Sequence, residues 1–263
     1  MSIVGTVESL WRYPVKSMRG EELDTLFAGY AGVHGDRLFA FHSTGSRKGL
    51  PYLTAREKTE MLRYRPRFRY PEKAIAPGNL AEAERLAPGA TPAPDPPEDL
   101  MLDVETPTRE TLAIDSPRLI EVLSAGLDGK HTLSLRRSER AMTDCRPVSL
   151  FSLQTVRQLA KETGISIDKR RFRANIYLDL TNSDGFAEND FVGRALRIGA
   201  KVTLAMVELD SRCMIITLDP ETAEKSPAVL KAVAQVHGGT AGLYAAVLVQ
   251  GMIRQGDTVE LLP

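Results

Sequence analysis

The feature that most constrains this chain is the alternation of apolar and polar residues with a period of two, which recurs along its length. Residues 194–207 show it best, because RALRI and KVTLAMV flank a turn at Gly199 and Ala200, a pattern that predicts a β-hairpin. Similar patterns predict further strands at 3–11, 37–41, 172–180, 243–249 and 258–262, the last after a turn at 256–257. The chain is therefore expected to fold mainly as β-sheet.

Three segments carry the start and stop signals of helices. They begin with a serine cap, in two cases followed by proline, and they cover residues 116–126, 152–164 and 226–237. Residues 77–99 are instead rich in Pro and Ala and poor in bulky apolar side chains, which predicts a mobile loop that could act as a lid. We expect a domain boundary near residue 115.

Charge and hydropathy exclude several classes of protein. The 263 residues include 34 Lys and Arg against 34 Asp and Glu, and this balance argues against nucleic acid as the main partner. No apolar run approaches the roughly 20 residues of a membrane helix, and the N-terminus lacks the pattern of a signal peptide. Two cysteines form no disulfide framework. We expect a cytoplasmic globular protein that binds neither nucleic acid nor membrane.

Common catalytic motifs are missing, but one cysteine stands out. The sequence has no G-x-G-x-x-G after a strand, no Walker loop, no H-E-x-x-H, and no histidine or cysteine spacing typical of zinc or iron–sulfur sites. Cys213 follows Arg212 directly, and a neighbouring guanidinium favours the thiolate, which is a soft metal ligand and a nucleophile. An isolated cysteine is also commonly a small buried hydrophobe, so the residue alone leaves both interpretations open.

Several short segments, taken in order, resemble a known family. They are WRYPVKS at 11–17, GDRLF at 35–39, YLTAR at 52–56, RFRANI at 171–176, FAENDFVG at 186–193, LRIG at 196–199 and SRC at 211–213. This order resembles an N-terminal MOSC β-barrel domain followed by a MOSC domain. The pattern is most similar to that of the mitochondrial amidoxime-reducing components and their bacterial counterparts, and it is weakest over residues 70–115. The resemblance implies a β-barrel fold with flanking helices, with an N-terminal domain at 1–115 and a cofactor-binding MOSC domain at 116–263.

The resemblance also implies a site for molybdenum held by molybdopterin, with Cys213 as the catalytic residue and metal ligand. The cofactor-binding residues that it implies are Lys16, Ser17, Arg37, Cys145, Arg146, Arg173, Asn175, Ser211, Arg212 and Tyr244. Arginine suits the cofactor's phosphate because its planar fork binds oxyanions bidentately. Arg173 and Asn175 are expected to alternate along one strand and to face the same side.

For some of these positions a purely structural role is an alternative to cofactor binding. Arg37 could pair with Asp36 at a strand edge, Tyr244 could pack in the core, and Arg56 is a weaker candidate that could form a salt bridge. Family members are also associated with pyridoxal phosphate binding.

Three positions depart from the pattern of the amidoxime reducers. Cys145 and Arg146 stand where those proteins carry small hydroxyl residues, and Asp210 stands where a cysteine is often found three residues before the metal ligand. Cys145 could be a spectator, a redox partner of Cys213 in the apoprotein, or a modifier of substrate choice. The substrate class is left open by these departures.

The function implied by the resemblance is reduction of N-hydroxylated or N-oxide compounds by a molybdenum cofactor. No iron–sulfur domain follows the barrel before Pro263, so electrons are expected from a separate flavin, iron–sulfur or haem protein. The alternative is a carrier of the molybdenum cofactor or of sulfur, with a persulfide on Cys213. A third possibility is a structural barrel without a cofactor.

Overall fold

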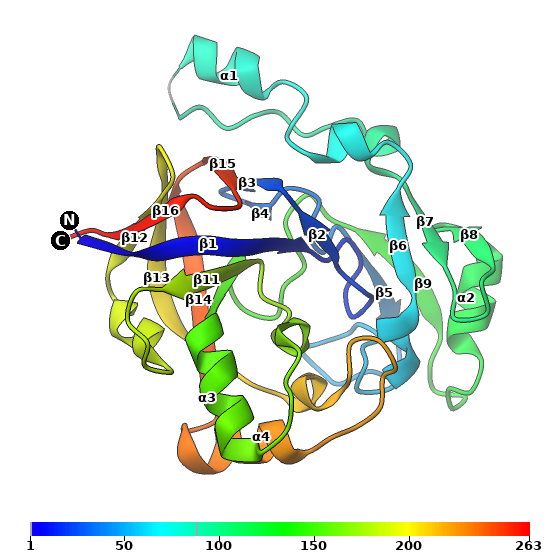
Figure 1. The fold of residues 1–263 in the computed structure, drawn as a ribbon. Coiled ribbons are helices and arrows are strands. Elements are labelled where there is room, and N and C mark those ends of the chain that lie inside the picture. The colour runs from blue at the N-terminus through cyan, green and yellow to red at the C-terminus, as the bar shows by residue number, and fades with distance from the viewer. Residues whose placement is uncertain (1, 88) are drawn as a thin grey trace.

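The computed structural model describes residues 2–87 and 89–263. Within this part of the chain, seven strands close into a barrel, because β1 pairs antiparallel with both β11 and β16 (Figure 1). The barrel strands are β1 (Ser2–Arg12), β10 (Val148–Ser152), β11 (Ile176–Leu180), β12 (Ala195–Ile198), β13 (Val202–Ser211), β14 (Thr240–Val249) and β16 (Thr258–Leu261). Their inward side chains form a continuous apolar core, so the prediction of a mainly β, barrel-type fold is confirmed.

The hairpin predicted at 194–207 is β12–β13, with Ile198 opposite Val202. Its turn requires glycine, because Gly199 has φ 59° and a Cβ there would lie 2.5 Å from Asp257 Oδ2. The strands expected near both ends of the chain are confirmed as β1, β14 and β16.

A second group of strands packs beside the barrel around its own apolar core. It contains β5 (Phe39–Ser43) paired with β9 (Leu133–Arg137), and the sheet β6 (Arg65–Phe68), β7 (Leu102–Glu105) and β8 (Thr111–Ala113). Shorter pairings join β1 to β2 (Glu21–Leu23), and β3 (Thr25–Gly29) to β4 (Gly32–Val33) and β15 (Gly251–Arg254). Strands from both sides of residue 115 pair with one another, since β1 lies in the barrel and β9 pairs with β5. The domain boundary near residue 115 stays a prediction.

The three expected helices are confirmed as α2 (Pro117–Ser124), α3 (Leu153–Thr163) and α4 (Ala228–Val236). Ser116 Oγ accepts a hydrogen bond from the Arg118 amide, and Ser152 Oγ accepts one from the Thr155 amide, as N-caps do. Gly164 ends α3 with φ 69°. Helices α3 and α4 lie together on one side of the barrel, across the molecule from β6 to β8 and α2 (Figure 1).

Two strand predictions need correction, and both corrections concern the site. Residues 169–172 form a 3-10 turn rather than a strand, because the Asp168 carboxylate accepts from the Arg170 amide and caps the turn. Arg173 then adopts φ 53°, and the strand begins only at Ile176. The prediction that Arg173 and Asn175 share one strand face is therefore wrong. Likewise Arg37, with φ 44°, precedes β5 instead of lying in it.

The segment 77–99, of which Pro88 lies outside the described residues, is more structured than a loop. It contains α1 (Leu80–Leu86) and leads into a 3-10 turn, Pro97–Leu100. Lys201, at the start of β13, pairs with Glu84, so α1 lies at the end of that strand opposite Cys213. None of the described residues of 77–99 lines the candidate site, so the expectation of a lid beside it is wrong. That the segment is mobile stays a prediction.

Candidate functional site

An open pocket lies where β13 ends, between the 3-10 turns at 169–172 and 214–217. We call it the cationic pocket. It encloses about 790 Å³ including its mouth, and its lining residues are Lys16, Ser17, Arg37, Thr54, Ala55, Arg56, Thr143, Asp144, Arg146, Ser149, Phe172, Arg173, Asp210, Ser211, Arg212, Cys213, Ile215 and Tyr244.

Most of the residues singled out from the sequence meet in this pocket. Lys16, Ser17, Arg37, Arg56, Arg146, Arg173, Ser211, Arg212, Cys213 and Tyr244 all line it. These residues come from segments far apart in the chain, and folding brings them to one end of the barrel.

Two of the expected cofactor-binding residues do not line the pocket. Asn175 is fully buried, and its side chain links neighbouring backbone groups by accepting from the Ser149 amide and donating to the Trp11 carbonyl, both at 3.2 Å. Cys145 is exposed, and its thiol donates to Glu208 Oε1 at 3.1 Å. This hydrogen bond, together with the partial loss of water around the thiol, raises the pKa of Cys145 and so disfavours its thiolate.

Positive charge exceeds negative charge in the cationic pocket. Among the described residues, six lysine and arginine side chains line it against only the carboxylates of Asp144 and Asp210. Lys16 pairs with Asp144 and donates to the Met142 carbonyl at 2.8 Å. The Arg56 side chain makes no hydrogen bond or ion pair within the described part of the chain, although its charge helps to lower the pKa of Asp144. A concave surface with excess fixed cations attracts and holds anions.

The backbone around the pocket is strained at three positions. Ser17, Arg37 and Arg173 have φ values of 64°, 44° and 53°, in the left-handed region that side chains other than glycine seldom adopt. Backbone hydrogen bonds hold two of them, from Arg37 N–H to the Tyr13 carbonyl at 2.7 Å and from Arg173 N–H to the Arg170 carbonyl at 3.1 Å. Such conformations cost about 1–3 kcal/mol each and cluster at binding and catalytic sites. The strain therefore points to this pocket independently of any motif.

Burial leaves two of the pocket cations, Lys16 and Arg173, under-compensated. It lowers the pKa of Lys16 even though Asp144 lies beside it, and it lowers the pKa of Arg173 to about 10, with repulsion from Arg37 adding to the effect. An anion bound among these groups would favour their charged forms and so raise both pKa values.

Cys213 is half-buried and caps the 3-10 turn Met214–Thr217 directly after β13. Its neighbour Arg212 is fixed by donating to the carbonyls of Ala241 at 2.6 Å and Phe172 at 2.9 Å. Arg212 also forms an ion pair with Asp210 at 2.9 Å, and these contacts hold its guanidinium at the pocket wall.

Sequence reasoning missed Asp144 and Asp210 as members of the pocket. Burial raises the pKa of Asp210, which also shares a hydrogen bond with Tyr244. Burial alone would raise the pKa of Asp144 too, but the neighbouring Lys16 lowers it. Asp210 was visible in the sequence as a departure from the family pattern three residues before Cys213, and Asp144 directly precedes another departure, Cys145.

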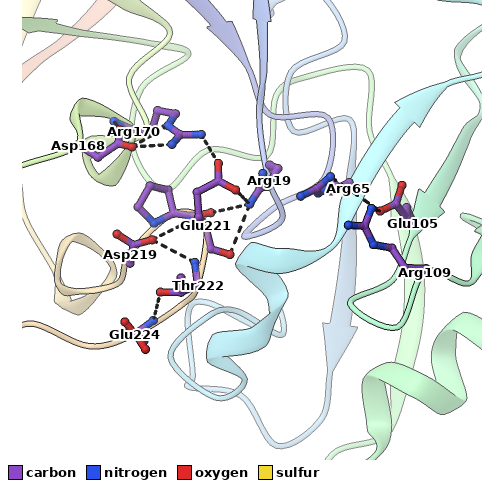
Figure 2. Close-up of polar contacts among 11 residues, drawn as sticks. Arg19, Arg65, Glu105, Arg109, Asp168, Arg170, Asp219, Glu221, Thr222 and Glu224 are labelled. Carbon is purple, nitrogen blue, oxygen red and sulfur yellow. Dashed lines mark hydrogen bonds and ion pairs between the residues drawn. The ribbon is translucent and has the colours of Figure 1, made fainter.

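A network of ion pairs anchors the loop that follows Cys213, and Figure 2 shows its members. We call it the Glu221 network, formed by Arg19, Asp168, Arg170, Asp219 and Glu221. Glu221 pairs with Arg19 and with Arg170, both at 2.5 Å, and Arg170 also pairs with Asp168 at 2.6 Å. Asp219 Oδ1 accepts from the Glu221 amide at 2.9 Å, which shapes the loop itself. The network therefore ties the segment carrying Cys213 to the turn carrying Arg173.

The donor set fits a metal-bearing, anionic cofactor. Cys213 offers one soft thiol ligand, and the surrounding cations and the Ser17 hydroxyl suit a phosphate group. No cluster of three His, Cys, Asp or Glu side chains that could hold a metal occurs in residues 2–87 and 89–263. A metal in this pocket would therefore take most of its ligands from the molecule that carries it.

Both halves of the chain match known domain families. Residues 4–117 match the MOSC N-terminal beta barrel domain, and residues 137–260 match the MOSC domain. No curated protein matches the sequence significantly. These matches support neither pyridoxal phosphate binding nor a particular likeness to the amidoxime-reducing components. Among the described residues, no helix has the length and apolar character needed to span a membrane.

Solved structures with related folds were also found. The YuaD protein from Bacillus subtilis is 14% identical over 98% of this chain and 95% of its own, with a TM-score of 0.49. YiiM from Geobacillus stearothermophilus is 19% identical over 45% of this chain and 55% of its own, with a TM-score of 0.35. YiiM from Escherichia coli is 15% identical over the same shares, with a TM-score of 0.33. On the strength of its two domain matches, the chain belongs to the MOSC family, which is associated with molybdenum cofactor binding.

Proposed function

We propose that this protein is a molybdenum cofactor-dependent oxidoreductase that reduces N-hydroxylated or N-oxide compounds with electrons from a separate donor protein. The observation that carries the proposal is that Cys213 lines the same pocket as six lysine and arginine residues and only two carboxylates among the described residues. A thiolate is a suitable protein ligand for a soft metal, and the cations suit the phosphate of a pterin cofactor. The association of the MOSC family with the molybdenum cofactor supports the same assignment.

In this proposal the chain binds and orients while the cofactor supplies the two-electron redox chemistry when bound. Cys213 Sγ is the protein ligand to the metal. Lys16, Arg173 and Arg56 are the cations best placed to hold the phosphate, because burial leaves the first two under-compensated and the third has no side-chain partner in the described structure.

Breaking an N–O bond consumes two electrons and two protons and releases the oxygen as water. The electrons come from the donor protein, so the chain must deliver protons to the leaving oxygen. Asp210 and Tyr244 are the candidates for this role, because both line the pocket and share a hydrogen bond. Burial raises the pKa of the Asp210 carboxyl, so it holds a proton at higher pH than an exposed aspartate does.

The test is turnover by protein purified from a molybdate-supplied host that makes the cofactor. We expect such protein to reduce benzamidoxime to benzamidine with reduced methyl viologen as the electron donor. Asp210→Asn should lower the turnover number while the molybdenum content stays at the wild-type level. Cofactor-loaded protein that fails to reduce benzamidoxime or other N-hydroxylated probes would contradict the proposal and favour a cofactor or sulfur carrier.

A further inference from the structure

A second cavity lies apart from the cationic pocket, beneath the strap formed by residues 91–95. It encloses about 990 Å³ including its mouth, and its walls include Phe27, Tyr30, Pro92, Pro94, Arg137 and Gln250. The strap is fastened at both ends, because the Gln250 amide donates to the Ala90 carbonyl and Asp95 Oδ1 accepts from the Gly78 amide at 2.7 Å. We call this space the strap cavity.

Arg137 lines the strap cavity without any partner in the described protein. Its side chain makes no hydrogen bond, ion pair or ring contact within residues 2–87 and 89–263, and its Nε is buried. Every other arginine treated above, except Arg56 in the cationic pocket, has a carboxylate or carbonyl partner. A partly desolvated guanidinium without compensation is unfavourable, and an anionic ligand would remove this cost.

The carboxylates around the strap cavity do not serve Arg137. Asp36 is engaged by Arg37 at 2.5 Å and by the Tyr13 amide at 2.8 Å. Asp95 lies 3.7 Å from His34 and accepts from the Gly78 amide. Glu139 stands at the exposed rim and forms no ion pair with any of the described cations.

A second buried polar atom also lacks a partner in this cavity. Gln250 is only 3% exposed, and while its Nε2 donates to the strap, its Oε1 has no hydrogen bond from the described residues. A second arginine, Arg140, lines the cavity but is exposed to solvent. Apart from these charged groups the wall is largely apolar, with the ring of Phe27, the half-exposed ring of Tyr30 and the proline rings of the strap. A few convergent polar groups in an apolar cavity are typical of a small-molecule site.

We propose that the strap cavity binds a small molecule with one anionic head group and an apolar body, the head at Arg137 and the body against Phe27, Tyr30 and the strap prolines. The head is a carboxylate or a phosphate monoester, since both offer oxygens that a guanidinium binds. The site is independent of the molybdenum chemistry proposed for the cationic pocket, because the two cavities share no lining residue.

The test compares octanoate, octyl phosphate and octanol as probes of the full-length protein by isothermal titration calorimetry. We expect the two anions to bind and octanol to bind about tenfold more weakly or not at all, because it lacks the charge-assisted hydrogen bonds. The stronger of the two anions identifies the head group. Arg137→Met should weaken the binding of either anion by about tenfold or more.

Arg136→Met is the matched control. Arg136 precedes Arg137 on β9, points to the opposite face of the strand and does not line the cavity, so its loss should leave anion binding unchanged. Hydrogen exchange of the wild-type protein gives a measurement that needs no variant, and octanoate should slow exchange in residues 91–95 and 137–141.

Failure of both anions to bind, binding of octanol as tight as that of the anions, or equal weakening by both arginine substitutions would overturn the proposal. The same holds if the protected amides lie around the cationic pocket instead. Cys213→Ser should bind octanoate as the wild type does, so a failure of the proposed reductase function would leave this result unaffected.

Discussion

Arginines in two neighbouring regions of this protein stand in opposite electrostatic situations. In the Glu221 network, Arg170 pairs with Asp168 at 2.6 Å and with Glu221 at 2.5 Å, and these hydrogen bonds raise its pKa (Figure 2). Arg173 follows in the same short segment, yet burial and the nearby Arg37 lower its pKa to about 10. Cations in the network are matched by carboxylates, whereas two of the pocket cations, Arg56 and Arg173, form no ion pair with any described residue.

This difference separates a structural role from a binding role. Matched ion pairs near the surface hold segments together at modest energetic value. A largely buried cation without a carboxylate partner, such as Arg173, reduces the stability of the empty protein, and an anion bound beside it removes this cost. The network and the pocket are adjacent, so substitutions in the two regions give a direct test of this assignment.

The largest effect is expected from Cys213→Ser. A hydroxyl is a harder and much less acidic ligand than a thiol, so molybdenum content and reductase turnover should fall by about 100-fold or more. The fold should persist, because Cys213 is only half-buried and Ser occupies less volume. Circular dichroism and metal analysis check the two statements, and a variant with wild-type turnover would exclude Cys213 as the metal ligand.

The pocket cations should come next in effect. Arg173→Ala or Lys16→Ala should weaken cofactor retention by about 10- to 100-fold, since charge-assisted hydrogen bonds to an anion contribute about 1.5–3 kcal/mol. The loss should grow in high salt because screening weakens the remaining cations. Cofactor content after gel filtration measures the effect.

Arg170→Ala is the matched control for this experiment, because Arg170 lies in the Glu221 network and does not line the pocket. It should retain the cofactor at close to the wild-type level. Equal losses from Arg170→Ala and Arg173→Ala would contradict the distinction between the two regions.

The network should show its effect in stability instead. Glu221→Gln should lower the free energy of unfolding by about 1 kcal/mol, because it removes two ion pairs that are partly exposed to solvent. Arg56→Gln in the pocket should change it by less than about 0.5 kcal/mol, since the exposed Arg56 side chain makes no hydrogen bond or ion pair with the described residues. Urea unfolding of the apoproteins distinguishes the two, and a larger loss from Arg56→Gln would contradict this account.

The smallest effects concern the two pocket carboxyls, whose pKa values shift in opposite directions. Burial raises the pKa of Asp210, so the folded protein takes up its proton before the unfolded chain does as pH falls. As the pH falls from about 7 to about 4, the free energy of unfolding of the wild type should therefore increase relative to that of Asp210→Asn.

Asp144 should behave differently over the same range. Its pKa is lowered by Lys16 against the effect of burial, so its contribution is present above the ordinary carboxyl pKa and is lost only at lower pH. The free energy of unfolding of the wild type relative to that of Asp144→Asn should stay constant from about pH 7 to about pH 4, and it should decrease at lower pH. If the stability difference from the wild type changed with pH in the same way for both variants, the pKa values of the two carboxyls would not be shifted in opposite directions.

Local sequence patterns predicted most of the strands and helices, because period-two alternation and serine caps act within a few residues. The ordered motifs also placed Lys16, Arg37 and Cys213 at one site, which the structure brings together. The same reasoning failed for Arg173, because the Asp168 cap begins a 3-10 turn that ends at Arg173 in a left-handed conformation, which alternation cannot reveal.

The strap cavity could not be predicted from the sequence, for a different reason. Arg137, Gln250 and Pro92 are distant in the chain and carry no motif, and only folding brings them to one cavity. The prediction that segment 77–99 covers the cationic pocket failed for the same reason. Composition shows that a segment has few bulky apolar side chains to bury, but it does not show which surface the segment covers.

The most direct test of the central claim is the molybdenum-to-protein ratio of wild type and Cys213→Ser from a cofactor-competent host, with identification of the released pterin. The cationic pocket with its thiol should hold about one molybdenum per chain in the wild type, together with molybdopterin, and Cys213→Ser should hold almost none. Wild-type protein without molybdenum, or equal loading of both proteins, would contradict the assignment of this pocket as the cofactor site.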